Sequence, residues 1–431
     1  MSNRAKTLLL IIVELILLFV AMAITVFIRK KGVPTEAYLL RHFDLFIYVF
    51  PLWIVFFFVE GLYSLRTYNP AGLPVSLIRA IFLSTITSFI FFYFLPASLA
   101  KVTPKSNLII IAALSFALLF IWRRSFYSFF SKVSRSRRTL LIGSPETIAL
   151  VAHEVERKPY LGFSIVKDIK PEEAELVAVE RSVIKDHETL KNIFALLGTE
   201  TEVMDLAKFA EKVSGKIPLK SIDESWFIEY CGHQESRAYD LVKSLIDKSV
   251  AITLMILLIP VAIILFPILL VVHGRPIFFS QTRTGLNNKP FTLYKLRSMV
   301  IDAEKNGAQW AIKGDARITP LGKLLRKTRL DELPQLINIL KGEMSLVGPR
   351  PERPEMIEKT LAPQIPFYNL RHLVKPGVTG WAQVNFRYGS STEDTMEKLQ
   401  LDLYYVKNRS VWIDILVILK TVKTVITGAG Q

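Results

Sequence analysis

The sequence predicts a membrane protein in three parts: an N-terminal bundle of four membrane-spanning helices, a small, degenerate Rossmann-like α/β module, and a mainly α-helical domain with a proline-kinked membrane helix of its own. Three observations support this prediction. Hydrophobic residues make up 51% of the chain, more than a soluble core needs. They are concentrated in long runs, and between these runs short β-like segments alternate with helical ones. The expected parts are residues 1–134, 135–232 and 238–431.

Four apolar runs account for the bundle, since a spanning helix needs about 20 apolar residues. The first run reaches that length before Arg29, which favours a retained anchor over a cleaved signal peptide. An even number of spans puts both ends of the bundle on one side of the membrane. The dense basic cluster at residues 123–138 indicates that this side is cytoplasmic, and it outweighs the smaller basic loop after the first run. The four runs are residues 8–28, 43–63, 80–99 and 108–122, the last being the shortest.

The middle segment has the pattern of a small α/β module. A β-like run at residues 139–143 leads through Gly143 into a helical stretch at residues 146–156. The second and third glycines of a dinucleotide-binding loop are absent, and without them the backbone cannot approach a pyrophosphate closely. A structural or regulatory role is therefore expected, and cofactor binding is disfavoured.

A later apolar run, residues 249–272, is long enough to cross the membrane as a fifth span. Two features favour a re-entrant helix that bends at Pro260 and returns. Both flanks are basic, with Lys248 before and Arg275 after, so charge gives no preference for crossing. Proline kinks a helix, and arms of about 11 residues reach only about half of a 30 Å hydrocarbon core. The last apolar stretch, residues 411–426, suits an interfacial helix or a core helix equally.

An acidic pair, Asp331 and Glu332, opens a short apolar segment that contains Pro334 and stops at Gly342. Proline belongs in a first helical turn and glycine just past a last one, so a helix is expected to start around residues 331–334, with the pair at its N-terminus. A helix N-terminus keeps carboxylates ionised and offers N–H groups to phosphate. An ionised carboxylate can act as a nucleophile or a magnesium ligand. An isolated pair of this kind is more often a simple helix cap.

The surrounding basic residues favour chemistry over capping. Phosphoryl transfer spreads charge over phosphate oxygens, which positioned cations stabilise. The net charge of +16 also favours phosphates and a membrane surface as partners. No nucleic-acid-reading motif is present, so nucleic acid is excluded, and a single cysteine excludes an internal disulfide. The basic residues are Arg275, Arg283, Lys295, Arg297, Arg326 and Arg350.

Together these motifs resemble the catalytic domain of the bacterial polyprenyl-phosphate sugar-1-phosphate transferases, the monotopic phosphoglycosyl transferases that start exopolysaccharide, capsule and O-antigen assembly. The four spans and the α/β module resemble the large members of that family. Two departures occur: Ile259 stands where a serine commonly precedes the helix-breaking proline, and Leu296 and Ser298 replace a more usual phenylalanine and threonine. The motifs are residues 281–285 (QTRTG), 294–299 (YKLRSM), 330–335 (LDELPQ), 345–351 (SLVGPRP) and 375–385 (KPGVTGWAQVN).

The resemblance implies a reaction in which Asp331 attacks the sugar-bearing phosphate of a UDP-sugar. UMP leaves, and undecaprenyl phosphate then takes the phosphosugar from the carboxylate. Asp331 and Glu332 would hold Mg²⁺, with Glu332 also able to relay protons, and Arg326 and Arg350 would clamp phosphate oxygens. The resemblance implies further substrate-binding roles for Gln281, Arg283, Lys295, Arg297, Gln383 and Asn385.

The expected location is the bacterial inner (cytoplasmic) membrane, with the catalytic domain on the cytoplasmic face. Expected partners are a UDP-sugar, undecaprenyl phosphate and membrane lipid, with a homodimer as an open alternative. Two other functions remain as alternatives: a membrane-anchored lipid-phosphate hydrolase, and a non-catalytic sensor or scaffold. The sugar is not predicted, because discrimination between hexoses depends on pocket contacts.

Overall fold

The structure is a computed structural model that describes most of the chain and divides into two compact units, Met1–Ser214 and Gly215–Gln431. Each unit is described by itself. The described residues are 3–30, 34–63, 72–94, 105–132, 136–183, 187–231, 237–301, 303, 315–386 and 391–427.

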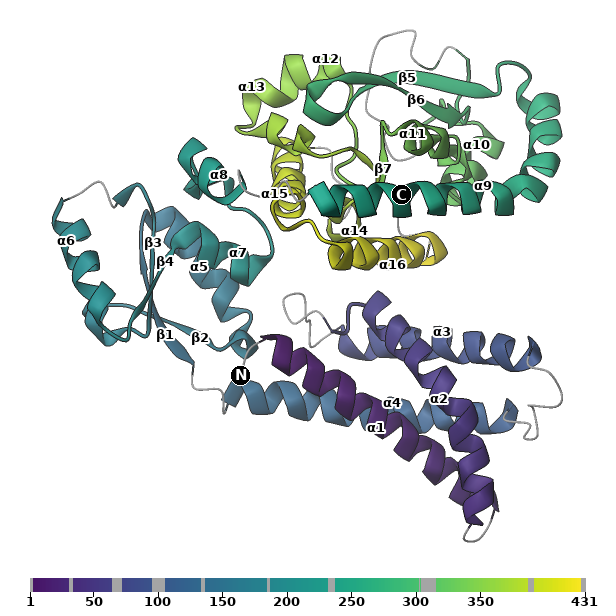
Figure 1. Cartoon of the computed structure of the whole chain (residues 1–431), viewed down its shortest axis with the longest axis horizontal. Helices are drawn as coiled ribbons and strands as arrows, with labels where there is room; N and C mark the ends of the chain where they lie inside the picture. The colour runs from purple at the N-terminus through teal and green to yellow at the C-terminus, as the bar shows by residue number, and fades with distance from the viewer. Residues whose placement is uncertain are drawn as a thin grey trace. The chain divides into compact units, whose positions relative to one another are not determined.

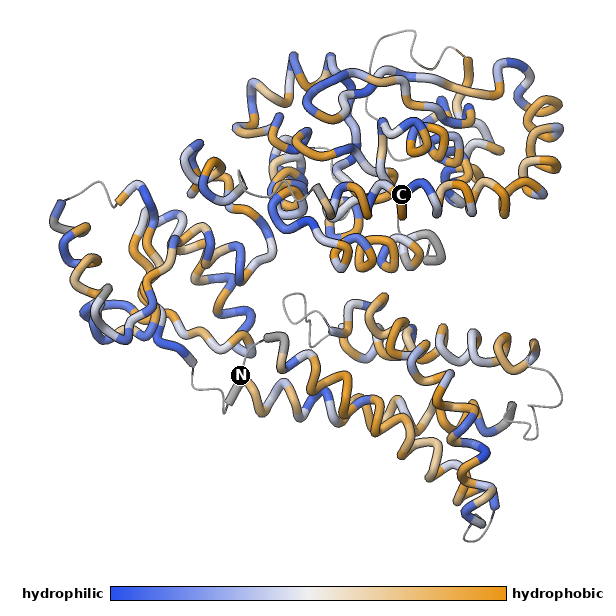
Figure 2. The backbone as a smooth tube through the Cα atoms, viewed as in Figure 1, coloured by the Kyte–Doolittle hydropathy of each residue, from blue (hydrophilic) through white to orange (hydrophobic). Residues whose placement is uncertain are grey.

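Four long helices begin the first unit, and each packs against the next, with the first also packing against the fourth (Figure 1). All four are long and apolar enough to cross a membrane, and their ribbons are predominantly hydrophobic (Figure 2). Residues 95–99 of the predicted third run lie outside the described residues. The helices are α1 (Asn3–Lys30), α2 (Glu36–Val59), α3 (Leu73–Phe94) and α4 (Lys105–Lys132).

The fourth helix continues well beyond Trp122, where the apolar run stops. Arg123, counted above in the basic cluster, is fully buried against Glu14 of α1, with an Nη2–Oε1 distance of 2.7 Å. The Tyr63 hydroxyl donates to Glu14 Oε2 at 2.6 Å, and Arg123 Nη1 donates to the carbonyl oxygen of Leu62. A charged residue is tolerated inside an apolar bundle when it is paired in this way. The pair therefore lets α4 extend through a position that hydropathy marks as its end.

Removing one member of this pair should destabilise the bundle, because a buried charge without its partner typically costs about 3–5 kcal/mol. We expect Glu14→Leu to lower the thermal unfolding temperature of the protein in detergent. Glu14→Leu/Arg123→Leu should recover most of the loss, because it removes both charges. Leu8→Ala, at an exposed position of α1, is the control. A double variant as unstable as the single one would contradict this account.

The rest of the first unit is a parallel four-stranded sheet in the order β2-β1-β3-β4, with helices in the connections. This agrees with the predicted α/β module. The strands are β1 (Arg137–Ile142), β2 (Phe163–Val166), β3 (Leu176–Val179) and β4 (Glu202–Asp205). The connecting helices are α5 (Pro145–Glu156), α6 (His187–Ala195) and α7 (Leu206–Ser214), with short 3₁₀ turns η2 (Pro159–Leu161), η3 (Pro171–Glu173) and η5 (Leu196–Gly198).

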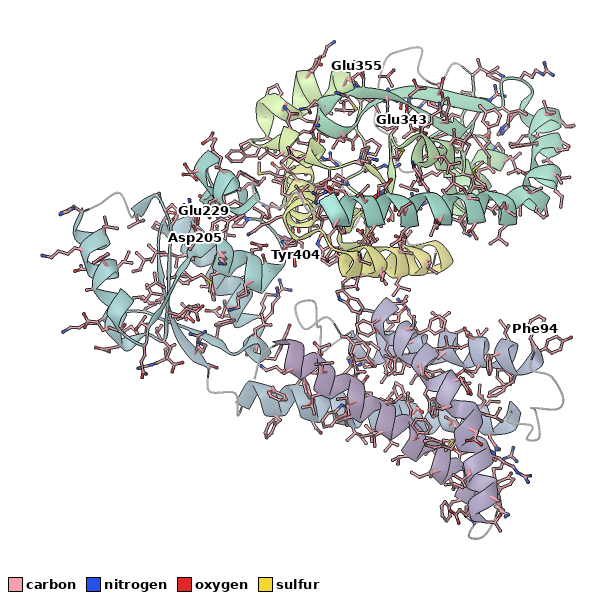
Figure 3. All side chains as sticks on the ribbon, viewed as in Figure 1. Phe94, Asp205, Glu229, Glu343, Glu355 and Tyr404 are labelled. Carbon is pink, nitrogen blue, oxygen red and sulfur yellow. The ribbon has the colours of Figure 1, made fainter. Side chains whose placement is uncertain are left out.

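Two carboxylates lie at the carboxyl edge of this sheet. Glu180 Oε2 accepts a hydrogen bond of 2.6 Å from the backbone N–H of Ser144 at the start of α5. That is where a dinucleotide-binding fold holds a phosphate, so a second anion would meet like charge. Asp205, labelled in Figure 3, accepts bonds from two backbone N–H groups of α7 and pairs with Arg181. Both carboxylates already have partners within the module.

The second unit opens with a short helix and a long one. The long helix, α9, contains Pro260 and Pro267, bends sharply before the following strand (Figure 1) and exposes apolar side chains along much of its length. Its first part is held by polar contacts: Lys243 Nζ donates to Asp414 Oδ2 at 2.8 Å, and the Ser345 hydroxyl donates to Asp247 Oδ2 at 2.6 Å. The elements are η6 (Leu219–Ser221), α8 (Glu224–Cys231) and α9 (Arg237–His273).

Short elements follow α9 and build the body of the unit. They include an antiparallel hairpin, β5–β6, and a two-stranded parallel pair, β7–β8. The strands are β5 (Phe278–Thr284), β6 (Pro290–Leu296), β7 (Ser345–Val347) and β8 (Gly377–Thr379). The shorter helices and turns are η7 (Leu286–Asn288), α10 (Pro320–Lys327), η8 (Leu330–Glu332), α11 (Gln335–Lys341), α12 (Pro354–Met356), η9 (Ile357–Leu361), α13 (Ala362–Gln364), η10 (Tyr368–Leu373) and α14 (Trp381–Asn385).

Two longer helices, α15 (Thr392–Asn408) and α16 (Val411–Thr427), complete the unit. The predicted last apolar helix, α16, has two kinds of surface. Val417 is buried in a cluster with Tyr405 of α15, whereas Trp412 is 58% exposed. The helix therefore packs on the body of the unit and also presents an apolar side outward.

Candidate active site

The acidic pair lies in a 3₁₀ turn that precedes α11. Arg329, just before the turn, has a left-handed backbone with φ +59°, and the turn η8 contains both acids. As predicted, Gly342 ends α11, at φ +81°. The helix starts at Gln335, just past the predicted start around residues 331–334, so the pair lies in the turn before the helix and not in its first turn. The 3₁₀ bond from the Glu332 N–H to the Arg329 carbonyl, at 3.2 Å, uses a donor that was expected to face phosphate.

Glu332 is surrounded by three cations from different segments. Its Oε1 lies 3.2 Å from Arg350 Nη2, 3.4 Å from Arg329 Nη1 and 3.8 Å from Lys295 Nζ. Burial would raise the pKa of Glu332, but the charges of Arg350, Lys295 and Arg329 outweigh it and lower the pKa to about 2. Glu332 is therefore ionised at neutral pH and holds the cations in place.

Asp331 is buried beside this cluster, and among the described residues its Oδ1 has no hydrogen-bond partner. Burial raises the pKa of Asp331, and the charge of Glu332 raises it further, while Lys295, Arg326 and Arg350 lower it. An unsatisfied buried carboxylate oxygen is costly. A ligand that supplied a phosphorus centre or a cation to this oxygen would remove that cost.

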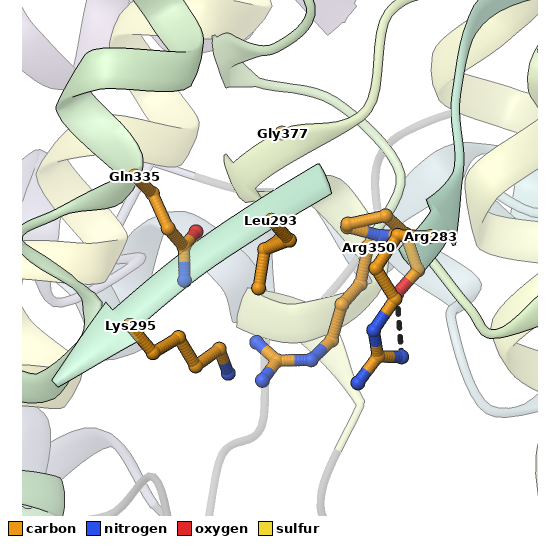
Figure 4. Close-up of a pocket in the computed structure, with 7 residues that line it drawn as sticks. Arg283, Leu293, Lys295, Gln335, Arg350 and Gly377 are labelled. Carbon is orange, nitrogen blue, oxygen red and sulfur yellow. Dashed lines mark hydrogen bonds between the residues drawn. The ribbon is translucent and has the colours of Figure 1, made fainter. Parts of the chain in front are cut away.

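A pocket adjoins the cation cluster, and in Figure 4 the side chains of Lys295 and Arg350 point toward one another across it. Its walls come from both hairpin strands, α11, the loop after β7 and the start of β8. Four of the seven lining residues can donate hydrogen bonds from their side chains, which suits a phosphate-bearing ligand. The lining residues are Arg283, Leu293, Lys295, Gln335, Arg350, Pro351 and Gly377.

The structure brings several of the predicted residues to this site. Arg283 and Lys295 line the pocket, and Gln281 Oε1 accepts a 2.7 Å bond from Arg283 Nη2. Arg326 lies close enough to Asp331 to affect its pKa, and its Nε donates to the Ser298 hydroxyl at 2.9 Å.

Three predicted residues have other surroundings. Arg297 donates through Nη2 to the carbonyl oxygens of His273 and Gly274, where α9 ends. On α14, Gln383 Nε2 lies 3.4 Å from the carbonyl oxygen of Val378, and Asn385 Oδ1 accepts a 2.6 Å bond from Lys420 Nζ of α16. None of the three lines the pocket described above. Their substrate-binding roles stay predictions.

Four residues of the site were not predicted: Arg329 and Gln335, which both stand within four residues of the acidic pair, and Arg371 and Asp402. Arg371 and Asp402 form a buried ion pair, with an Nη2–Oδ2 distance of 2.7 Å. Arg329 and Gln335 could have been predicted, because they are close to the acidic pair in the sequence. No local pattern connects Arg371 with Asp402, because their proximity arises only from the fold.

Comparison with known proteins identifies relatives of this chain. The family model described as "Bacterial sugar transferase" matches residues 238–428. A Bacillus subtilis protein named "Uncharacterized sugar transferase EpsL" is 41% identical over 199 residues, 44% of this chain and 90% of the relative. A Caulobacter vibrioides protein named "UDP-glucose:undecaprenyl-phosphate glucose-1-phosphate transferase" is 38% identical over 192 residues, 44% of this chain and 72% of the relative.

A relative from Aeromonas hydrophila, named "UDP-N-acetylgalactosamine-undecaprenyl-phosphate N-acetylgalactosaminephosphotransferase", is 38% identical over 228 residues, and the match covers 53% of each protein. The chain thus spans only about half the length of this relative. The apolar helices indicate a membrane-associated protein, and the family match makes it a transferase. The chain belongs to the bacterial sugar transferase family.

The cation cluster should make ligand binding dependent on pH. Burial and the charge of Arg350 lower the pKa of Lys295 to about 8, so its ammonium loses its proton above that pH. UDP is fully ionised above about pH 7.5, since the second pKa of a phosphate ester is near 6. We expect the affinity for UDP, measured by calorimetry, to fall by up to about tenfold per pH unit above pH 8.

Lys295→Arg should remove this dependence, because arginine stays charged. Lys289→Arg, at an exposed position of the hairpin turn, is the matched control and should keep the wild-type profile. A wild-type affinity that is constant to pH 9.5 would contradict the role of the Lys295 charge.

Proposed function

We propose that this protein transfers a sugar-1-phosphate from a UDP-sugar to undecaprenyl phosphate and releases UMP, giving undecaprenyl-diphosphate-sugar. The observation that carries the proposal is the buried Asp331 oxygen, which has no hydrogen-bond partner among the described residues and lies beside cations held by Glu332. The names of relatives supply the donor and acceptor classes. The first step of surface polysaccharide assembly is the role that this product would serve.

The proposed reaction has two displacements at one phosphorus. An Asp331 carboxylate oxygen attacks the sugar-bearing phosphorus, and the bond from that phosphorus to the UMP oxygen breaks. UMP leaves as the dianion. A phosphate oxygen of undecaprenyl phosphate then attacks the same phosphorus, and the bond to Asp331 breaks, which restores the carboxylate. The phosphorus passes through a state with charge on its equatorial oxygens, and Lys295, Arg350 and Arg283 are the cations available to stabilise it.

Mg²⁺ is part of the proposal, and the donor set fits it. Magnesium is commonly held by one or two carboxylates together with substrate phosphates and water. Asp331 offers an unused oxygen, whereas the Glu332 carboxylate already faces three cations. Asp331, with Glu332 beside it, would hold the ion, which when bound neutralises charge on the diphosphate. The main proposed role of Glu332 is to orient Arg350 and Lys295.

The donor sugar is left to experiment. Relatives are named for N-acetylgalactosamine, for glucose and for galactosyl transfer, so similarity at this level does not select one. A screen of UDP-sugars with UMP as the readout would identify the donor.

For the membrane arrangement, we propose that α1 to α4 span the inner membrane and that α9 is re-entrant, with the catalytic domain on the cytoplasmic face. The bend in α9 and its two internal prolines support this. The arm after Pro260 has 13 residues up to His273, about 20 Å at 1.5 Å per residue. That length is short of a hydrocarbon core of about 30 Å.

Asp331→Asn should abolish transfer, because an amide does not form the acyl phosphate. We expect UMP release from membranes supplied with UDP-sugar, Mg²⁺ and undecaprenyl phosphate to fall by roughly 10³-fold or more. Without acceptor, the wild-type protein should gain the mass of one sugar phosphate on the peptide that contains Asp331.

Glu355→Gln, an exposed carboxylate on α12 (Figure 3), is the control and should keep full activity. Phosphate release from the lipid without any UDP-sugar would indicate the hydrolase instead. Full activity of Asp331→Asn would remove the nucleophile from the proposal, and wild-type protein that yields no UMP with any donor would favour a scaffold.

The re-entrant arrangement predicts that residues on either side of α9 face the same compartment. Cysteines placed at Glu224 and Asn287, both exposed, in a Cys231→Ser background should react with a membrane-impermeant maleimide only after the inner membrane is opened. Labelling of one position from the periplasmic side of intact spheroplasts would instead indicate a fifth span.

A further inference from the structure

The loop that carries Arg350 is held by four contacts to its carbonyl oxygens, each from outside the loop. Pro349 and Pro351 have no N–H, so this segment cannot join a regular hydrogen-bonded structure. The backbone N–H groups of Gly377 and Thr284 donate to the carbonyls of residues 349 and 352 at 3.0 and 2.9 Å. The carbonyls of residues 350 and 351, which lie between these two, accept hydrogen bonds from arginine side chains.

One of these arginines is Arg283, whose Nη1 donates to the Pro351 carbonyl at 3.1 Å. The other is Arg371 of η10, whose Nη2 donates to the Arg350 carbonyl at 2.8 Å. Arg283 lines the pocket, but Arg371 does not. Arg371 therefore contacts the site through the backbone of Arg350.

Arg371 is itself held from two sides. Its Nη2 lies 2.7 Å from Asp402 Oδ2 of α15, and its Nη1 donates to the Tyr368 hydroxyl at 2.5 Å. Arg371 and Asp402 are both buried. A buried guanidinium needs a counter-charge and several acceptors, and this arrangement supplies both. The ion pair therefore connects α15 to the carbonyl of residue 350.

We propose that Arg371, fixed by Asp402, is a positioning residue that sets where the Arg350 guanidinium lies. The inference rests on the proposed transferase function and deepens it. Arg350 Nη2 lies 3.2 Å from Glu332 Oε1 and lines the pocket beside Lys295. A shift of about 1 Å in a positioned catalytic group can cost about 10²-fold in rate, so the loop backbone must be held as firmly as the side chain.

A kinetic cycle tests this inference. Arg371→Lys keeps the charge, but an ammonium cannot reach the same three acceptors in the plane of a guanidinium. In the wild-type background we expect kcat for UMP release to fall roughly 10²-fold, with the KM for UDP-sugar changed less than threefold. In an Arg350→Lys background, where the Arg350 guanidinium is already absent, the same substitution should lower kcat by less than about threefold. Non-additivity of this kind identifies residues that act together.

Arg409→Lys is the matched control, because Arg409 forms an ion pair with Asp240 at the surface of the same unit. It should leave kcat unchanged. If Arg371→Lys does not fold, Asp402→Asn takes its place in the cycle. Equal losses in both backgrounds, or an unchanged kcat, would overturn the positioning role. Wild-type protein that releases no UMP would overturn the transferase proposal itself, so the two failures are distinguishable.

Discussion

The site depends on the attraction between the buried Glu332 carboxylate and three cations. Arg350, Lys295 and Arg329 come from three segments, and each would be costly to bury without a counter-charge. Because a single carboxylate faces all three, the cluster keeps a net positive charge, which suits a diphosphate ligand. Asp331 is the neighbouring acid whose oxygen these cations do not occupy. The two adjacent acids thus have different roles: Glu332 pairs with the cations, and Asp331 keeps an oxygen that they do not contact.

Ion pairs with little exposure also join distant parts of the chain elsewhere. Glu14 and Arg123 are 109 residues apart and link α1 to α4. Lys243 and Asp414 are 171 residues apart and link α9 to α16. The first pair is fully buried in the apolar bundle, where only a close partner makes a charge tolerable. The pairs therefore specify which helices pack together, which apolar contacts alone do less selectively.

Much of the fold could be predicted, because its signals are local. Apolar runs predicted the long helices, and β-like runs alternating with helical ones predicted the α/β module. Gly342 marked the end of α11 because only a residue without a side chain adopts that backbone easily. The fourth helix was predicted too short, because a charged residue such as Arg123 indicates the end of an apolar helix unless its partner, Glu14, is known. The acidic pair was predicted at a helix N-terminus, whereas it lies in a 3₁₀ turn that follows the left-handed Arg329 and precedes α11.

The sequence by itself determined the class of protein and the acidic pair with most of its basic neighbours, because hydropathy and motif spacing are properties of short segments. Only the tertiary structure decided that the Asp331 oxygen has no partner within the described part of the chain, that Arg297 contacts the end of α9, and that Arg371 and Asp402 contact the Arg350 loop. Hydrogen bonds and ion pairs depend on distances of a few ångströms between residues far apart in the chain, and folding alone sets those distances.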